Sequence, residues 1–286
     1  MSVADDIPDG AEEAAALAAR SRRDALYGFL ARVVPPIVIL IVVLAAWEIA
    51  VRVAKVPVYI VPGPIVILQT LVRDWSTLYP SLLVTLSITL GALALATVLG
   101  VAIAVLFAQS KWIELSLFPY AVILQVTPIV AIAPLIIIWV RDTTTALLIC
   151  AWIVAFFPIV SNTTLGLNST DHNLLHLLQL YGASRRQVFW ILRLPSALPY
   201  FLGGLRISGG LALIGSVVAE FVAGSGGIQS GLAYRILEAG YQLQIPRMFA
   251  ALFMITGTGI VIFIVLTAVS HFALHRWHES AVRREG

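Results

Sequence analysis

The chain has 286 residues, of which 60% are apolar and only 12% are charged, and its formal net charge is +3 at pH 7. Soluble globular proteins are about 45–50% apolar and about 25% charged, so this chain has roughly half the usual charge. This composition argues against a soluble enzyme, a soluble nucleic-acid binder and a disordered protein. The single cysteine, Cys150, excludes a disulfide framework and a cysteine-rich metal site. The composition indicates an integral membrane protein.

The first 32 residues precede any long apolar run, with acidic residues early and arginines late. A cleaved signal peptide has a basic start and a shorter apolar core, so this segment does not fit one. The Ala-rich stretch 11–32 is typical of a helix. We interpret residues 1–32 as a cytoplasmic leader with an interfacial helix, and a solvated linker is an equally good interpretation.

Six apolar stretches follow, and each is long enough to cross a hydrocarbon core, which needs about 20 mostly apolar residues. None shows the period-two alternation that a membrane β-barrel requires. We assign residues 33–275 to a transmembrane domain and 276–286 to a cytoplasmic tail. The sequence predicts an all-α polytopic membrane protein with about six transmembrane helices, over residues 33–52, 82–107, 115–139, 145–167, 199–223 and 248–274.

The basic residues predict an orientation for these helices, because cytoplasmic loops are enriched in Lys and Arg. With the N-terminus inside, twelve basic residues fall on the cytoplasmic side, Arg206 among them, and six fall outside. We therefore expect both termini in the cytoplasm.

Ionisable groups are nearly absent from the interiors of the predicted spans. Membrane-embedded enzymes and proton-coupled carriers usually keep such groups at mid-membrane for function. The chain has no HExxH motif, no paired mid-span carboxylates and no Ser-His or Ser-Lys arrangement, so we expect neither catalytic residues nor a metal site. The Gly-rich stretch 224–231 lacks the Lys-Ser/Thr of a phosphate-binding loop, and we interpret it as a flexible loop.

Polar residues inside or beside the spans are candidates for a solute path. In the third span, Pro128 and Pro134 predict a break, with two polar residues just before it. Hydrogen bonding between helices is the alternative role for each candidate. An acid at the end of the fifth span could also pair with Arg235 or Arg247 as an outer gate. The candidates are Gln125, Thr127, Asn162, Ser216 and that acid, Glu220.

The longest predicted cytoplasmic loop, residues 168–198, has the pattern of two helices joined by a turn. A Leu-rich stretch at 174–180 is followed by Gly182, and Ser184 with Gln187 forms a capping box that begins a second helix. We expect that helix to end at Pro195. We call this helix–turn–helix segment, residues 174–195, the elbow. If it were only a solvated connector, the leucines of its first helix would be exposed to water. The elbow is therefore better explained as a surface for another protein.

This elbow resembles the cytoplasmic signature loop of binding-protein-dependent ABC importer permeases. In that signature a Gly, an Ile nine residues later and a closing Leu-Pro are spaced as Gly182, Leu192 and Leu194-Pro195 are here. The front of the signature differs, since His176-Leu177-Leu178 stand where the family has Glu-Ala-Ala. Further segments, VPGP, QVTPIVAIAPLIIIW, FFPIVSNTTLGL and VVAEFVAGSGGI, resemble the branch that imports sulfonates, taurine and nitrate.

The resemblance implies a type I ABC importer permease in the bacterial inner membrane, moving a small solute inward by alternating access. A cytoplasmic ATPase subunit would bind the ATP, a periplasmic binding protein would deliver the solute, and a second permease copy would complete the pathway. The chain itself would hold no cofactor and would not be an enzyme. The alternative is a self-contained channel or secondary carrier. The resemblance places the ATPase-coupling contacts at His176, Leu177, Leu178, Leu180, Gly182, Ala183, Ser184, Arg185, Arg186, Leu194 and Pro195.

Overall fold

The computed structural model describes residues 31, 34–224 and 230–275. The predicted leader helix (apart from residue 31), the predicted cytoplasmic tail and most of the Gly-rich loop lie outside these residues. The described residues contain five helices long and apolar enough to cross a membrane, or six if one bent pair counts as a single span. The prediction of an all-α membrane fold with about six spans is confirmed.

The chain divides into two compact units, residues 1–66 and 67–286. The described part of the first unit is built around the helix Val34–Val53, which is the first predicted span. Near its end, the carboxylate of Glu48 pairs with Arg52 and accepts a hydrogen bond of 3.2 Å from the backbone N–H of Ile65. The acid that interrupts the first span is therefore partnered within this unit.

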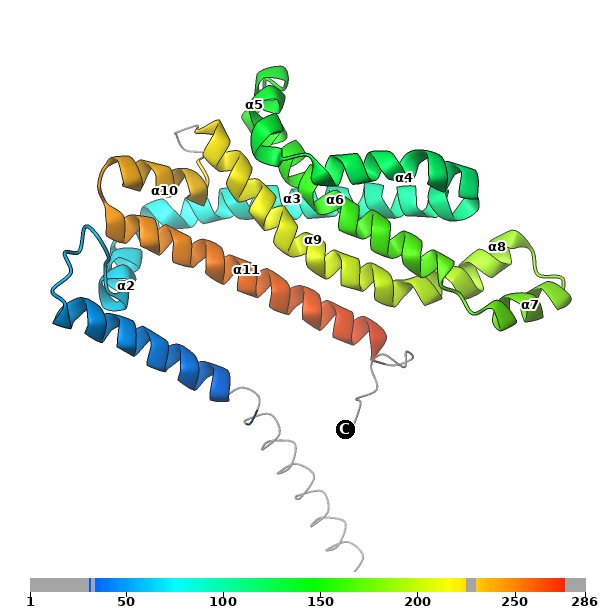
Figure 1. Ribbon diagram of the computed structural model, residues 1–286, viewed down its shortest axis with the longest axis horizontal. Helices are drawn as coiled ribbons and strands as arrows, with labels where there is room; N and C mark the ends of the chain where they lie inside the picture. The colour runs from blue at the N-terminus through cyan, green and yellow to red at the C-terminus, as the bar shows by residue number, and fades with distance from the viewer. Residues whose placement is uncertain (1–30, 32–33, 225–229, 276–286) are drawn as a thin grey trace, which may run out of the picture. The chain divides into compact units, whose positions relative to one another are not determined.

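The second unit holds the remaining spans (Figure 1). Helix α2 (Pro64–Arg73) begins at the junction between the units. The helices that follow are α3 (Trp75–Gln109), α4 (Lys111–Val126), α5 (Ile129–Trp139), α6 (Thr143–Asn168), α7 (His172–Leu180), α8 (Arg185–Val188), α9 (Leu194–Ala223), α10 (Leu232–Tyr241) and α11 (Ile245–Leu274).

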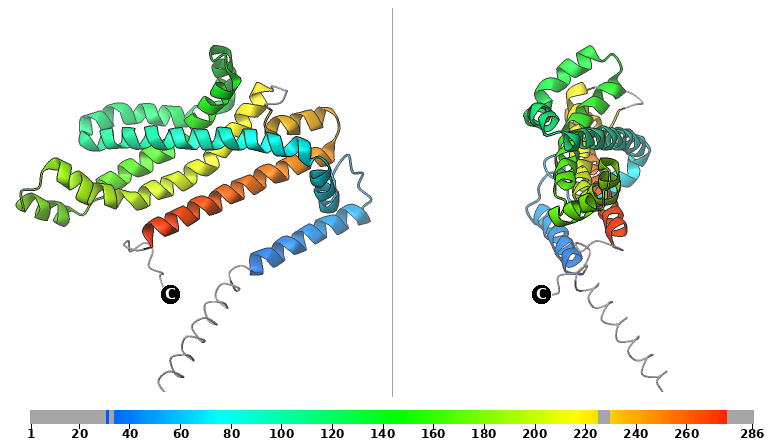
Figure 2. Two further views of the ribbon diagram at one scale, coloured as in Figure 1. Left: turned by 180° about the vertical axis from the view of Figure 1, so that it is seen from behind. Right: turned by 90° about the vertical axis from the view of Figure 1, so that its right-hand side faces the viewer.

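The core of the second unit is formed by α3, α6 and α9, each of which packs against the other two (Figure 2). Glycines allow this close approach, because a Cβ on Gly204 would lie 2.7 Å from the carbonyl oxygen of Pro158, and one on Gly100 would lie 2.8 Å from the side chain of Ile159. Small residues are the usual means by which membrane helices approach each other. The glycines of α3 and α9 therefore let these helices pack closely against α6.

The third predicted span is a broken one. Helices α4 and α5 meet at an angle of 97° at Thr127 and Pro128. Pro128 lies in extended backbone and begins α5, whereas Pro134 lies inside α5 without interrupting it. The prediction of a break is thus right for Pro128 and wrong for Pro134.

The second helix of the elbow does not end at Pro195, contrary to expectation. A π-helical turn, Phe189–Arg193, joins α8 to α9, and the helical run is continuous from Arg185 to Ala223. At the end of the turn, the N–H of Leu194 donates to the carbonyl of Phe189, five residues earlier. A proline inside an α-helix clashes with the carbonyl four residues before it. The wider π turn before Pro195 relieves this clash, so the helix continues through the proline.

Candidate functional site

The elbow joins α7 to α8 through a turn whose backbone hydrogen bonds are all local. At the end of α7, Gly182 has a φ of +71°, and its N–H donates to the carbonyl of Gln179 at 3.0 Å. The N–H of Ala183 donates to the carbonyl of Leu178, also at 3.0 Å. These two bonds form a Schellman motif, in which a left-handed glycine ends the helix and satisfies its last carbonyls. The predicted interruption at Gly182 is confirmed.

The capping box at the start of α8 is also confirmed. The N–H of Ser184 donates to Oε1 of Gln187 at 2.8 Å, and the N–H of Gln187 donates to Oγ of Ser184 at 3.3 Å. The Schellman motif ends at Ala183 and the capping box begins at Ser184, so local hydrogen bonds determine the path of the chain between the two helices.

Helix α7 projects from the body of the unit and has no buried side chain. Asp171 caps its start by accepting a hydrogen bond of 2.7 Å from the N–H of Asn173. Leu180 and Tyr181 at its end are 86% and 83% exposed. Such exposed apolar side chains outside the membrane spans are typical of a protein-binding surface.

The helical run after the turn is attached to α3. Arg193 Nη1 donates to the carbonyl of Ala108 at 3.2 Å, and Phe189 packs against a small cluster of buried residues from α3, α6 and α9. The Ala108 carbonyl is one of the last four of α3, which have no partner within the helix and carry its partial negative charge. The arginine satisfies this end of α3 and anchors the elbow there.

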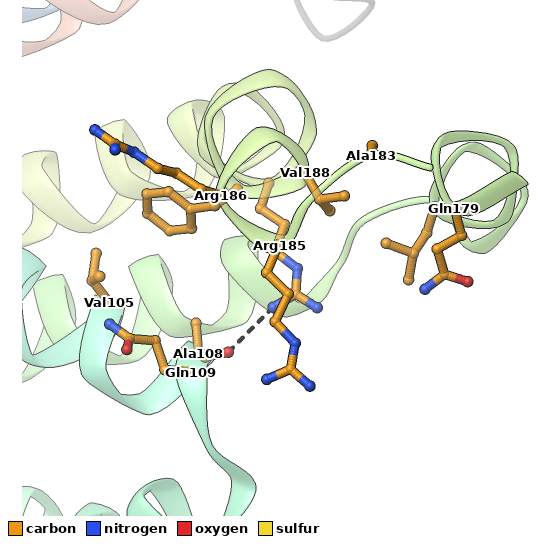
Figure 3. A pocket seen from close by; sticks show the side chains of 11 residues that line it. Val105, Ala108, Gln109, Gln179, Ala183, Arg185, Arg186 and Val188 are labelled. Carbon is orange, nitrogen blue, oxygen red and sulfur yellow. Dashed lines mark hydrogen bonds between the residues drawn. The ribbon is translucent and has the colours of Figure 1, made fainter. Parts of the chain in front are cut away.

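A cavity of about 750 Å³ lies between α7, the turn and the end of α3 (Figure 3). Its lining includes Arg185, Arg186 and Arg193 and no acidic residue. In Figure 3, Arg185 and Gln179 lie on opposite sides of the turn at Ala183. The cavity therefore combines positive charge with apolar side chains, and it suits a segment that carries both acidic and apolar groups.

Of the predicted elbow residues, Gly182 and Ser184 shape the turn, and Leu177, Leu180, Arg185 and Arg186 are exposed beside it. His176 is exposed on α7 as well, while Leu178 is partly buried. Leu194 and Pro195 lie in the first turn of α9 and are partly buried.

The predicted path residues do not converge on one site. Ser216 is buried and its hydroxyl lies 2.8 Å from that of Thr89, which joins α9 to α3. Asn162 donates to the carbonyl of Pro158 within α6. Gln125 and Thr127 lie apart from these, beside the break between α4 and α5. Of the two roles considered for Ser216, the structure contains the hydrogen bond between helices.

The predicted pairing of Glu220 with Arg235 or Arg247 is wrong. Glu220 is only 3% exposed, and its Oε2 accepts a hydrogen bond of 3.0 Å from the N–H of Ala233 in the first turn of α10. Arg235 instead donates to Ser81 and pairs with Glu238. Glu220 thus supplies a partner for a helix N-terminus, whose N–H groups otherwise lack one.

Sequence reasoning missed the charged contacts at the end of the second unit opposite the elbow. Arg247, in the first turn of α11, donates to Asp74, which precedes α3, at 2.6 Å. Asp74 also accepts from Arg73 at 3.0 Å. A basic residue in the first turn of one apolar helix and an acid directly before another are the signals that could have suggested this pair.

No group of three or more His, Cys, Asp or Glu side chains that could hold a metal ion occurs among the residues that the structure describes.

The comparisons with known proteins identify the class. Residues 96–284 match the family of binding-protein-dependent transport system inner membrane components, and the chain belongs to this family. It is a multi-pass permease subunit of an ABC importer for small solutes, and membership implies ATPase and substrate-binding-protein partners. The resemblance drawn from the elbow is confirmed, and the alternative of a self-contained channel or secondary carrier is set aside.

Curated relatives match most of the chain. The formylaminopyrimidine transport permease protein ThiX of Halalkalibacterium halodurans is 32% identical over 240 residues, which are 84% of this chain and 94% of that protein. The riboflavin transport system permease protein RibX of Chloroflexus aurantiacus is 32% identical over 85% of this chain and 90% of that protein. The putative aliphatic sulfonates transport permease protein SsuC of Bacillus subtilis is 30% identical, with 84% and 82% covered.

A solved structure supports the fold. The crystal structure of an amino acid ABC transporter with histidines matches with a TM-score of 0.58 and 18% identity, covering 72% of this chain and 96% of that one. At this identity the likeness establishes the permease fold and nothing about the solute.

Proposed function

We propose that this permease works as one of two identical copies and that ATP hydrolysis by a cytoplasmic partner reaches it through the elbow. The partner ATPase would contact α7 and the cavity behind it. Both termini and the elbow would then lie in the cytoplasm, with α10 on the periplasmic side.

The observation that carries this proposal is the construction of the elbow. Helix α7 exposes its apolar side chains, while the turn is held by a Schellman motif and a capping box. Beyond the turn, Arg193 and Phe189 anchor the helix to the core. A partner that moved α7 would therefore move α9 as well, because the connection has no unstructured segment in which the motion could be lost.

The solute proposed for this permease is a small organic or inorganic molecule delivered by a periplasmic binding protein. Relatives are named for sulfonates, taurine and nitrate, which are anions or zwitterions, and also for formylaminopyrimidine and riboflavin. A sulfonate, taurine, nitrate or a related small solute is the class we favour.

Photo-crosslinking from two equally exposed positions tests the contact with the ATPase. Leu180 on the elbow and Tyr241 on α10 are both 86% exposed, and they lie at opposite ends of the second unit. A photoreactive residue at Leu180 should cross-link to the ATPase subunit, and one at Tyr241 should cross-link to the binding protein or to neither. Cross-linking of the ATPase from Tyr241 and not from Leu180 would reverse the proposed orientation.

A substitution at the turn tests coupling separately. We expect Gly182→Glu to leave the permease inserted and assembled, while ATP hydrolysis no longer drives uptake. Normal uptake by this variant would reject the elbow as the coupling element.

A further inference from the structure

Arg206 lies deep within the apolar part of the second unit, not at its cytoplasmic edge as its place in the sequence suggested. Ser208, two residues later, donates to the carbonyl of Ala155 at 2.6 Å. Ala155 is at the middle of α6, a helix of 26 residues without a charged side chain. Because each helical residue advances about 1.5 Å, the backbone of Arg206 lies within one turn of the midpoint of this span.

The guanidinium of Arg206 has no partner in the part of the chain that the structure describes. Its Nε is buried and makes no hydrogen bond, and no carboxylate forms an ion pair with it there. Charged groups in membrane spans are costly, and they usually face a water-filled path or pair with an opposite charge. An unpartnered arginine at this depth therefore indicates a ligand that arrives from outside the chain.

Space for such a ligand lies directly beside this arginine. Gly203 and Gly210 are one turn before and one turn after Arg206 on the surface of α9, and a Cβ on either would meet no atom within 4 Å. Ile207 and Ile214 on the same face are more than half exposed. This face of α9, which we call the open face, runs along the helix and has Arg206 at its edge.

The other side of Arg206 is closed by α11. Ile262 and Leu266 of α11 pack against Gly209, and nearby Thr267 has a buried hydroxyl without a hydrogen-bond partner. Arg206 thus lies at the boundary between packed helices and the open face.

We propose that Arg206 binds the negatively charged group of a small anion, such as a sulfonate or a carboxylate, on the open face of α9 at mid-membrane. The proposal deepens the proposed function, since that anion would be the transported solute. The guanidinium would donate paired hydrogen bonds to two oxygens of the anion. Gly203 and Gly210 would leave room for the rest of the molecule.

A cysteine beside Arg206 can report both water access and charge. In a Cys150→Ala background, Gly210→Cys places a thiol one turn from Arg206. We expect it to react faster with anionic sulfonatoethyl methanethiosulfonate than with the cationic trimethylammonium reagent. Adding Arg206→Gln should lower the ratio of the two rates about tenfold, since a unit charge at this separation acts strongly in a partly dehydrated site. Arg206→Lys should preserve the ratio.

The matched control is Ile214→Cys, one turn further along the same face. Its reactivity should change less with Arg206→Gln, because the thiol is farther from the charge. Methanesulfonate at millimolar concentration should slow modification of Gly210→Cys, whereas uncharged dimethyl sulfone should not. A thiol at position 210 that reacts with neither reagent would mean that lipid or the second permease copy covers the open face. That result, or a rate ratio that Arg206→Gln leaves unchanged, would overturn the proposal.

The full-length permease without its partners suffices for these measurements, so they do not depend on coupling to the ATPase. Failure of the proposed function would appear as normal uptake with Gly182→Glu, while the cysteine reactivities stayed as expected. Failure of the anion site alone would appear as cysteine reactivities that do not respond to Arg206→Gln, while Gly182→Glu still abolished ATP-driven uptake.

Discussion

The Nε atom of Arg247 lies 2.6 Å from Oδ2 of Asp74 and joins the first turn of α11 to the residue that precedes α3. The side chains are 23% and 8% exposed. Hydrogen bonds that involve charged groups contribute about 1.5–3 kcal/mol when they are shielded from water. The contact therefore holds together two helices whose connecting residues span most of the chain.

We expect Asp74→Asn and Arg247→Gln each to lower the thermal unfolding midpoint in detergent, and the double variant to lose less than the sum. The coupling free energy should be about 1–3 kcal/mol. Arg73→Gln is the control, because Arg73 pairs with the same carboxylate but its side chain is 72% exposed. Exposed ion pairs contribute little to stability, so Arg73→Gln should shift the unfolding midpoint much less than Arg247→Gln does. Additive effects of the two main substitutions would contradict the pairing.

The same carboxylate predicts a pH dependence. Burial raises the pKa of Asp74, but the hydrogen bonds from Arg247 and Arg73 outweigh it and hold that pKa below its ordinary value. A group whose pKa is lower in the folded state stabilises the fold above its unfolded pKa, about 4, and loses that contribution as the pH falls through the folded pKa. The stability difference between the wild type and Asp74→Asn should be constant from about pH 5 to 8 and shrink below about pH 4. A difference that grows on acidification would reject this.

Adjacent glycines on α9 allow a matched test of helix packing. A Cβ on Gly204 would lie 2.7 Å from the carbonyl of Pro158, whereas one on Gly203 would meet nothing within 4 Å. We expect Gly204→Ala to destabilise the protein by about 1–3 kcal/mol, because overpacking would separate α6 from α9. Gly203→Ala should leave the unfolding midpoint nearly unchanged. Equal effects of the two substitutions would mean that glycine acts here through helix propensity and not through packing.

Two left-handed glycines allow a matched test of the elbow. Gly182 and Gly224 have φ values of +71° and +56°, and both would leave an added Cβ in open space. Alanine at either position should cost about 1–2 kcal/mol of local backbone strain. Because Gly182 lies in the elbow and Gly224 ends α9 at the opposite side, we expect only Gly182→Ala to reduce the ATP-dependent uptake rate. Uptake assays in proteoliposomes would show this, and a similar loss in both variants would reject the distinction.

Two substitutions can distinguish the role of Glu220 as a cap of α10 from the effect of its charge. Glu220→Gln keeps an oxygen that can accept from the N–H of Ala233, whereas Glu220→Ala leaves that buried donor without a partner. We expect Gln to retain the unfolding midpoint and Ala to cost about 1–3 kcal/mol. Faster amide hydrogen exchange in α10 of the alanine variant would place the loss there. Equal stability of the two variants would mean that the carboxylate does not serve as a cap.

The sequence predicted the spans because charge is so costly in lipid that its absence marks them. It could not separate Pro128 from Pro134, since either proline can break a helix. The surroundings decide: Ala133, directly before Pro134, is fully buried in a core cluster with residues of α3, α6 and α9, which holds α5 together.

The candidate site was predictable in its turn and less so elsewhere. Gly182, Ser184 and Gln187 act through local hydrogen bonds with the backbone. The spacing of these residues in the sequence is sufficient to predict such bonds. The surroundings of Glu220 and Arg206 depend on where α9 begins and on which helix packs opposite each residue. Because the helix continues through Pro195, Arg206 lies about 30 Å from Arg185, far deeper than a span beginning at 199 would place it.

The unbroken helix from Arg185 to Ala223 has a mechanical consequence. It acts as a rigid rod about 55 Å long, with the elbow at one end and Glu220 near the other. A tilt of about 10° at the elbow would displace the far end by roughly 9 Å, while Arg206, at the middle, would move by about half as much. Opening at one face of the membrane and repositioning of the mid-membrane charge would then be a single motion.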